Sequence, residues 1–441
     1  MRKWIVRLSF GCLLPFLLLA CIAIGVVKYL TRHQPEWPDP VPGMSLVPER
    51  PLLFELTEDN GVYHLQQLAD RTNQGNIPLN DVIKKGREEK LAFGVERPEW
   101  DQLTVDYPEL LGLFERATDC PFWQAKSPES YDELATTVTP MLDLARLNAY
   151  RMEQAAVGGH WDEMEEIFRR QLDASRKFAQ GGAIIHCLVS IACESITFTA
   201  WTEILAHSDP PPATLERIGG FVAASAAERV PMEEVFKVEW INISNAVDVV
   251  FDGDSRDLGF TLPKGMKPLM SPERTRDNLH ALWTHEIDGL LPFAGHSVTD
   301  SFVEDLEAGR PALMFLADDP LGRTFVAILF PATAKIVDDD RLSTLRYELI
   351  PVLHALERHQ QAKGGYPDTL NELVPDLLDT VPEDPSSQGA PIRYQRQGER
   401  FLLYALGGRN GKDNGGVHGG DGRSSNESDF VIHPTKRMLE E

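Results

Sequence analysis

An uncharged stretch near the start of the chain constrains its architecture most. Leu8 to Val27 contains no charged side chain, and a helix of that length, rising 1.5 Å per residue, spans about 30 Å, one bilayer core. Residues 1–7 are basic, and a basic start keeps the N-terminus in the cytoplasm. The pattern predicts a cytoplasmic tip and transmembrane anchor over residues 1–33. The protein would be single-pass in the inner membrane, with its bulk periplasmic.

Two other interpretations of this segment stay open. Leu18–Ala20 before Cys21 is a pattern typical of a lipoprotein signal, although Ile22–Val27 remains apolar after the cysteine. A cleaved signal peptide would have a shorter apolar run and a small-residue cleavage site. Retention, cleavage and lipidation at Cys21 all place the body of the chain outside the cytoplasm.

The next stretch, residues 34–52, is rich in proline. Its prolines are Pro35, Pro38, Pro40, Pro42, Pro48 and Pro51. This composition favours an extended, semi-stiff chain. We expect a spacer that lifts the folded body from the bilayer.

Charge and cysteine content exclude several classes of protein. The formal net charge is -24, and so acidic a chain repels nucleic acid, so we expect no nucleic-acid partner. Beyond the apolar segment the cysteines are Cys120, Cys187 and Cys193, and no CxxC pair is present. Neither a zinc site nor a thioredoxin-like motif is indicated, and buried free thiols are expected.

Residues 53–335 show helical spacing of apolar side chains, which predicts an α-helical domain. The clearest expected helices cover residues 107–116, 134–156, 161–178, 184–205, 214–226 and 232–250. The helix over 184–205 is nearly all apolar, but it carries Glu194 and Glu203. We interpret it as a core helix rather than a second membrane span. Residues 252–272 predict a loop.

Residues 145–174 resemble one unit of a tetratricopeptide-type helical hairpin. A glycine turn at Gly158 and Gly159 precedes Trp161, which would open the second helix. Met164 stands where a small residue is expected, and no second copy follows at ~34-residue spacing, whereas stacked repeats need about three copies. We favour an ordinary antiparallel helix pair.

The sequence carries no recognisable catalytic motif. A GxSxG elbow, a Walker loop and a glycine-rich dinucleotide fingerprint are all missing. His285 and Glu286 begin like a zinc-protease helix, but Gly289 stands where the second histidine is needed, and His280 lies off that helix face. We therefore expect no enzyme and no catalytic residues. A third, alternative function is an unrecognised envelope hydrolase that uses His280, His285 and His296.

The C-terminal part, residues 336–441, follows a different pattern. Asp338–Asp340 precede a predicted helix from Arg341 to Lys363, and Gly364 ends it. A short helix, a hairpin, a glycine-rich loop and a third strand follow over residues 370–377, 392–406, 407–428 and 429–432. The chain is therefore predicted to be mainly α, with a C-terminal α+β module that contains a small antiparallel sheet.

Spaced residues in this module resemble the globular domain of the major pseudopilin of type II secretion. The family pattern is G-x-Y-P-x-x-L-x-x-L, then P-x-D-P, then strand tyrosines and an acidic glycine loop. The matching residues are Gly365, Tyr366, Pro367, Leu370, Leu373, Pro382, Asp384, Pro385, Tyr394, Tyr404, Gly407 and Asp429. The resemblance covers about residues 338–433.

The resemblance implies a calcium site, because the glycine-rich loop of that family binds calcium. Carboxylate and carbonyl oxygens suit this ion, and glycines let the backbone wrap it. The ligands implied here are Asn410, Asp413, Asp421 and Asp429, and Asn414 lies in the same loop. The loop is longer than in the family, and Asn410 stands nearest to the family's first loop aspartate.

The N-terminus departs from the family. Gly11 is followed by Cys12 to Phe16 without the glutamate of a prepilin cleavage site, and about 300 residues separate the anchor from the module. We therefore expect a membrane-anchored extracytoplasmic binding or scaffold protein with protein partners in the cell envelope. A component of a type II secretion or pilus-like assembly is the alternative.

Overall fold

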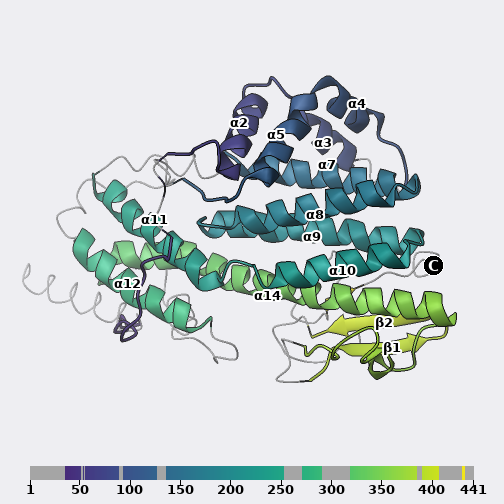
Figure 1. The fold of residues 1–441 in the computed structure, drawn as a ribbon. Helices are drawn as coiled ribbons and strands as arrows, with labels where there is room; N and C mark the ends of the chain where they lie inside the picture. The colour runs from purple at the N-terminus through teal and green to yellow at the C-terminus, as the bar shows by residue number, and fades with distance from the viewer. Residues whose placement is uncertain are drawn as a thin grey trace, which may run out of the picture. The chain divides into compact units, whose positions relative to one another are not determined.

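The computed structural model describes residues 35–50, 53, 55–88, 93–126, 136–252, 271–290, 318–384, 390–406 and 430–432. Within these ranges the chain is mainly α-helical and carries one small antiparallel sheet, which confirms the predicted fold class at this level (Figure 1). The predicted anchor, with Cys12 and Cys21, lies outside the described residues. Most of the loop predicted at 252–272 also lies outside them.

Packing divides the chain into two units. Unit 1 comprises Met1–Val47 and Trp240–Lys335, and unit 2 comprises Pro48–Glu239 and Ile336–Glu441. The boundaries at 239 and 335 fall within α11 (Met232–Asp252) and α14 (Pro320–Lys363). Residues from Ile336 onward thus share a unit with most of the predicted helical domain. A separate domain over 336–441 stays a prediction.

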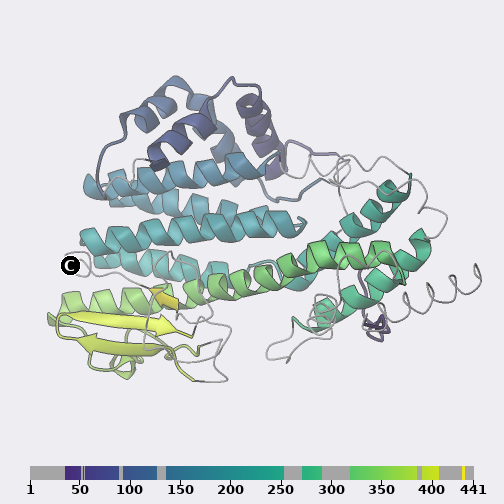
Figure 2. The same cartoon turned by 180° about the vertical axis from the view of Figure 1, so that it is seen from behind.

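The helices of unit 2 before α14 include five that lie near the predicted ranges 107–116, 134–156, 161–178, 184–205 and 214–226, and three earlier ones for which no range was predicted. They are α2 (Gly61–Asn73), α3 (Leu79–Glu88), α4 (Pro98–Asp106), α5 (Pro108–Asp119), α7 (Val138–Val157), α8 (Trp161–Phe178), α9 (Ile184–His207) and α10 (Pro212–Ala226). The helices α7, α8 and α9 pack against one another, as the view in Figure 2 also shows. The turn between α7 and α8 contains Gly159 at φ 72°, a conformation that glycine adopts without strain.

The amphipathic pattern of α8 explains its place in the core. Met164, Phe168 and Leu172 recur at helical spacing and are fully buried. The Phe168 ring lies 5.9 Å from that of Trp201 on α9. Among the described residues, α9 alone is long and apolar enough to cross a membrane, and most of it is buried inside the protein.

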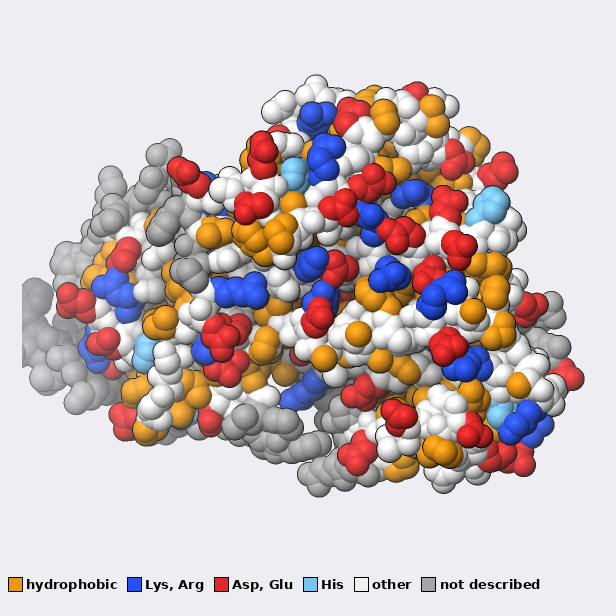
Figure 3. Space-filling model, in the orientation of Figure 1, with side chains coloured by type: hydrophobic (Ala, Val, Ile, Leu, Met, Phe, Trp, Pro, Cys, Tyr) orange, Lys and Arg blue, Asp and Glu red, His pale blue; other side chains and the backbone are white. Residues whose placement is uncertain are grey.

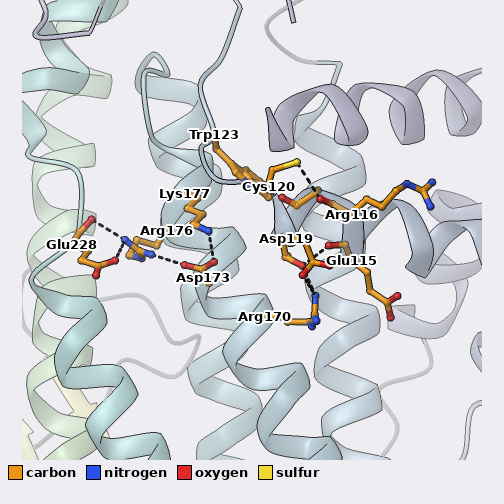
Figure 4. A network of polar contacts seen from close by, with 12 residues as sticks. Glu115, Arg116, Asp119, Cys120, Trp123, Arg170, Asp173, Arg176, Lys177 and Glu228 are labelled. Atoms are coloured by element: carbon orange, nitrogen blue, oxygen red, sulfur yellow. Dashed lines mark hydrogen bonds and ion pairs between the residues drawn. The ribbon is translucent and has the colours of Figure 1, made fainter. Parts of the chain in front are cut away.

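Ion pairs join α8 to its neighbours on two sides. Arg170 contacts Asp119 of α5 at 2.8 Å, and Arg176 contacts Glu228, which follows α10, at 2.5 Å (Figure 4). Arg176 is only 7% exposed, so its charge is compensated by these contacts rather than by water. The network fixes the lateral position of α8 between α5 and the end of α10.

The start of α14 differs from the prediction. The sequence predicts a helix from Arg341, after three aspartates, but the helix begins at Pro320 and runs for 44 residues. Asp319 caps it instead, because its Oδ1 accepts the Gly322 N–H at 3.0 Å. Asp340 lies within the helix and forms an ion pair with Arg229 at 2.7 Å.

The C-terminal sheet lies along the last part of α14. The 3-10 helix η4 (Leu370–Leu373) precedes β1 (Arg393–Gln397), β2 (Arg400–Ala405) and β3 (Phe430–Ile432), which form an antiparallel sheet in the order β1-β2-β3. Phe401 and Leu403 of β2 share one hydrophobic core with Leu353 of α14. The hairpin turns at Gly398, which has φ 69°.

The described part of the proline-rich segment is not a free spacer. Residues 35–47 belong to unit 1, together with α12 (Pro272–Asp288). The Val41 N–H donates to Oγ1 of Thr284, a buried α12 residue, at 2.9 Å. The expectation that this stretch lifts the body from the bilayer therefore needs correction over these residues.

Candidate functional site at the base of the C-terminal loop

The predicted calcium ligands Asn410, Asp413, Asp421 and Asp429 lie outside the described residues, but both ends of their loop are described. Ala405 of β2 pairs with Phe430 of β3 in the sheet. Residues 407–429 therefore leave and re-enter the sheet at neighbouring positions of adjacent strands. A sheet that holds both ends of a loop can position binding residues on that loop.

A buried carboxylate fixes the backbone where the loop begins. Asp384 is 1% exposed, and its Oδ2 accepts the Leu406 N–H at 2.8 Å and the Arg393 guanidinium at 2.7 Å. The Asp384 N–H in turn donates to the Ala390 carbonyl at 2.8 Å. The side chain of Asp384 thus ties the residue after β2 to β1, and its backbone N–H binds Ala390, shortly before β1. In the sequence Asp384 is only one of the residues that match the family pattern, and its contacts in the structure give it this role.

A second carboxylate approaches the same place from α14. Burial raises the pKa of Glu348, and the negative charge of Asp384 raises it further. Within the described ranges, no group of three or more His, Cys, Asp or Glu side chains is placed to hold a metal ion.

Four residues that carry the family resemblance meet at the corner between α14 and β1. The Tyr394 hydroxyl donates to the Pro367 carbonyl at 2.7 Å. His359 of α14 shares a 2.9 Å hydrogen bond with the Gly365 carbonyl. The Tyr366 hydroxyl donates to Glu357 at 2.8 Å, which brings the chain after α14 back onto that helix. Two of these hydrogen bonds hold Gly365 and Tyr366 against α14, and the third joins Pro367 to β1.

A buried polar cluster that the sequence analysis missed joins α9 to α14. Glu194 is 1% exposed, and its Oε1 accepts the Tyr347 hydroxyl at 2.9 Å, while Ser343 donates to Oε2. Arg229 lies 3.7 Å from Glu194 and 2.7 Å from Asp340. In this cluster the Arg229 guanidinium compensates the charge of the buried carboxylate, and two hydroxyls donate hydrogen bonds to it. The only sequence signal was Glu194 itself, one of two glutamates in a nearly all apolar helix.

The three cysteines that the structure describes are buried and free, as the sequence predicts. Burial raises the pKa of the Cys187 and Cys193 thiols well above the usual range. A thiol with a raised pKa carries little thiolate and is a poor nucleophile. These positions offer no reactive cysteine.

The histidines of the alternative hydrolase hypothesis have other contacts. The His280 ring lies 5.4 Å from that of Trp240, edge to face. His285 shares a 2.8 Å hydrogen bond with the Asp39 carbonyl. His296 lies outside the described residues. The positions of His280 and His285 do not add a catalytic arrangement to the sequence pattern.

No family model matches the chain, and no curated protein or solved structure is similar enough to count as a match. The pseudopilin resemblance therefore rests on the spaced residues of the module alone and stays a prediction.

Proposed function

We propose that this chain is a single-pass, membrane-anchored periplasmic binding or scaffold protein, with a pseudopilin-like C-terminal module that calcium stabilises. The observation that carries the proposal is the closed base of residues 407–429. Ala405 of β2 pairs with Phe430 of β3. The N–H of Leu406, the residue just before the loop, donates to the Asp384 side chain. Asn410, Asp413, Asp421 and Asp429 would supply oxygen ligands from within that loop.

The helical part of unit 2 supports a role in binding a protein partner. Figure 3 shows acidic and basic side chains interspersed over the visible face of the molecule, with hydrophobic side chains scattered between them. A mixed surface of this kind suits a protein partner better than nucleic acid, which needs a concentrated basic patch. The net charge of -24 also disfavours nucleic acid as a partner, because an acidic protein repels it.

Thermal unfolding of the full chain in detergent, with calcium and then with chelator, tests the calcium part. A ligand that binds only the folded state stabilises it by about 2.7 kcal/mol at one hundred times its dissociation constant. We expect calcium to raise the unfolding midpoint by several degrees, and magnesium to raise it less.

The variants Asp413→Asn and Asp421→Asn should lose this calcium response. Asp379→Asn removes an exposed acid of the same module outside the loop and should keep it. An unchanged midpoint at millimolar calcium would reject the calcium site. An equal loss of response in all three variants would show a general charge effect instead.

The alternative, a component of a type II secretion or pilus-like assembly, rests on the resemblance of residues 338–433 to the major pseudopilin alone. Affinity purification of the tagged chain from cross-linked membranes separates the two proposals. Enrichment of secretion components over a tag-only membrane protein would favour the assembly. Enrichment that persists in cells lacking the secretion system would favour a separate scaffold role.

A further inference from the structure

A buried arginine of α14 binds the first described residues of the chain. Arg323 is 2% exposed, and its Nη2 donates to the Pro35 carbonyl at 2.8 Å. Its Nε donates to the Asp318 carbonyl at 2.9 Å, and the guanidinium lies 5.1 Å from the centre of the Trp37 ring. A charged group that is buried to this extent needs such partners, because it has lost its hydration. Pro35 and Trp37 are therefore part of the folded unit.

Two further hydrogen bonds hold the residues that follow. The Asp39 carbonyl lies 2.8 Å from Nε2 of His285, and the Val41 N–H donates to Thr284 at 2.9 Å. Both partners are side chains of α12. We call residues 35–41, with Arg323, Thr284 and His285, the clamp. Its contacts all lie within unit 1.

The clamp lies a short distance along the chain from the predicted anchor. The uncharged segment ends at Val27, and residues 28–34 separate it from Pro35. Seven residues span at most about 24 Å when fully extended. While the contacts of the clamp are formed, the proline-rich residues after Pro35 cannot lengthen the tether between the predicted anchor and unit 1.

We infer that the clamp holds unit 1 at the surface of the lipid bilayer, with α12 and the start of α14 as its membrane-proximal elements. The inference rests on the anchor of the proposed function. The partner of this surface is the bilayer itself, held by covalent tethering rather than by charge attraction. Unit 1 is then the membrane-proximal part of the chain, and the chain first enters unit 2 after Val47.

Energy transfer from a labelled residue of α12 to acceptor lipids tests the inference on the full chain in liposomes. Asp277→Cys places a donor dye on an exposed position of α12. Cys120, Cys187 and Cys193 are buried, so they should label poorly. Two insertions of about ten Gly-Ser residues are then compared. One stands before the clamp, between His33 and Gln34, and the other after it, between Val47 and Pro48.

We expect the two insertions to affect energy transfer differently. The insertion before the clamp lengthens the tether, so transfer should fall by at least half. The insertion after the clamp should leave transfer unchanged, because the donor and the anchor are on the same side of it. An equal fall with both insertions would overturn the inference, since the residues would then act as a free spacer. Weak transfer in the chain without an insertion would overturn it as well.

Flotation with the same liposomes distinguishes failure of the clamp inference from failure of the predicted anchor. A chain that does not float with the vesicles would reject the anchor and, with it, the inference. A chain that floats but responds equally to both insertions would reject only the clamp. The variant Arg276→Ala, which removes an arginine of α12 that pairs with Asp248 and not with residues 35–41, should keep the wild-type transfer.

Discussion

Trp201 donates its indole N–H to Nε2 of His354 across 2.7 Å, which joins α9 to α14. His354 accepts this hydrogen bond only when Nε2 is unprotonated, so the folded protein holds a neutral imidazole. Burial lowers the pKa of His354 to about 3, and it lowers the pKa of His186 to about 4.

These two histidines predict a loss of stability on acidification. The unfolded chain protonates each imidazole near pH 6.5, whereas the folded chain does not. The unfolded state therefore binds more protons as pH falls below 6.5. The free energy of unfolding should decrease by up to about 1.4 kcal/mol per pH unit for each histidine until its folded pKa is reached. Urea denaturation between pH 7 and pH 4.5 measures this slope.

Substitution isolates the histidine contribution from that of the carboxylates. His354→Gln should give a shallower slope than the wild type, and His160→Gln, at an exposed position, should not change it. Equal slopes for the wild type and His354→Gln would contradict the assignment of the slope to buried imidazole.

The cluster around Glu194 predicts a graded response to substitution. Tyr347→Phe removes one hydrogen bond to a buried carboxylate and should cost about 1.5–3 kcal/mol. Glu194→Ala leaves Arg229 without one of its acidic neighbours and creates a cavity, so it should cost about 3–5 kcal/mol. Chemical denaturation measures both, and Tyr107→Phe controls for loss of a hydroxyl elsewhere. A cost for Tyr347→Phe no larger than for Tyr107→Phe would show that the cluster adds no stability.

Two aspartate–arginine pairs of the C-terminal module offer a matched comparison. Asp384 is buried and pairs with Arg393, while Asp368 pairs with Arg396 at 2.6 Å with 79% of its side chain exposed. Asp384→Asn should cost about 2–3 kcal/mol, and Asp368→Asn less than about 1 kcal/mol. Hydrogen exchange at the Leu406 amide should accelerate only in the first variant. Unchanged exchange there would show that Asp384 does not hold the start of the loop.

The ion pairs of α8 predict a similar contrast. Arg176 is buried between Asp173 and Glu228, so Arg176→Ala should cost about 2–3 kcal/mol. Arg71 pairs with Glu109 at 3.5 Å on the surface, and Arg71→Ala should cost less than about 1 kcal/mol. Urea denaturation at low and high salt measures both. Added salt should reduce the smaller effect more, because dissolved ions screen an exposed pair more strongly than a buried one.

Periodicity located most helices because their buried faces repeat at 3.6 residues. The predicted helix over 161–178 coincides with α8, and that over 184–205 is two residues short of α9. The α14 start was missed because Pro331 and the aspartates at 338–340 resemble a helix boundary. Propensity is outweighed there by tertiary contacts, such as the ion pair between Arg229 and Asp340.

The candidate site was predictable only in outline. The spacing of Gly365, Tyr366 and Tyr394 indicated the module, since local motifs are visible in one sequence. The pairing of Asp384 with the Leu406 amide and of Glu194 with Tyr347 joins residues far apart along the chain. Sequence patterns do not report such contacts, so both roles emerged only from the structure.

The bond between Arg323 and the Pro35 carbonyl bears on how a soluble version of this protein should be prepared. A protein cut just after the apolar stretch but before Pro35 keeps the Pro35 carbonyl and the Trp37 ring beside the buried guanidinium. A cut one residue later, at Glu36, deletes the carbonyl and leaves the charge short of a hydrogen bond. Two preparations that differ by a few N-terminal residues should therefore differ in yield and in melting behaviour, although neither contains any membrane segment.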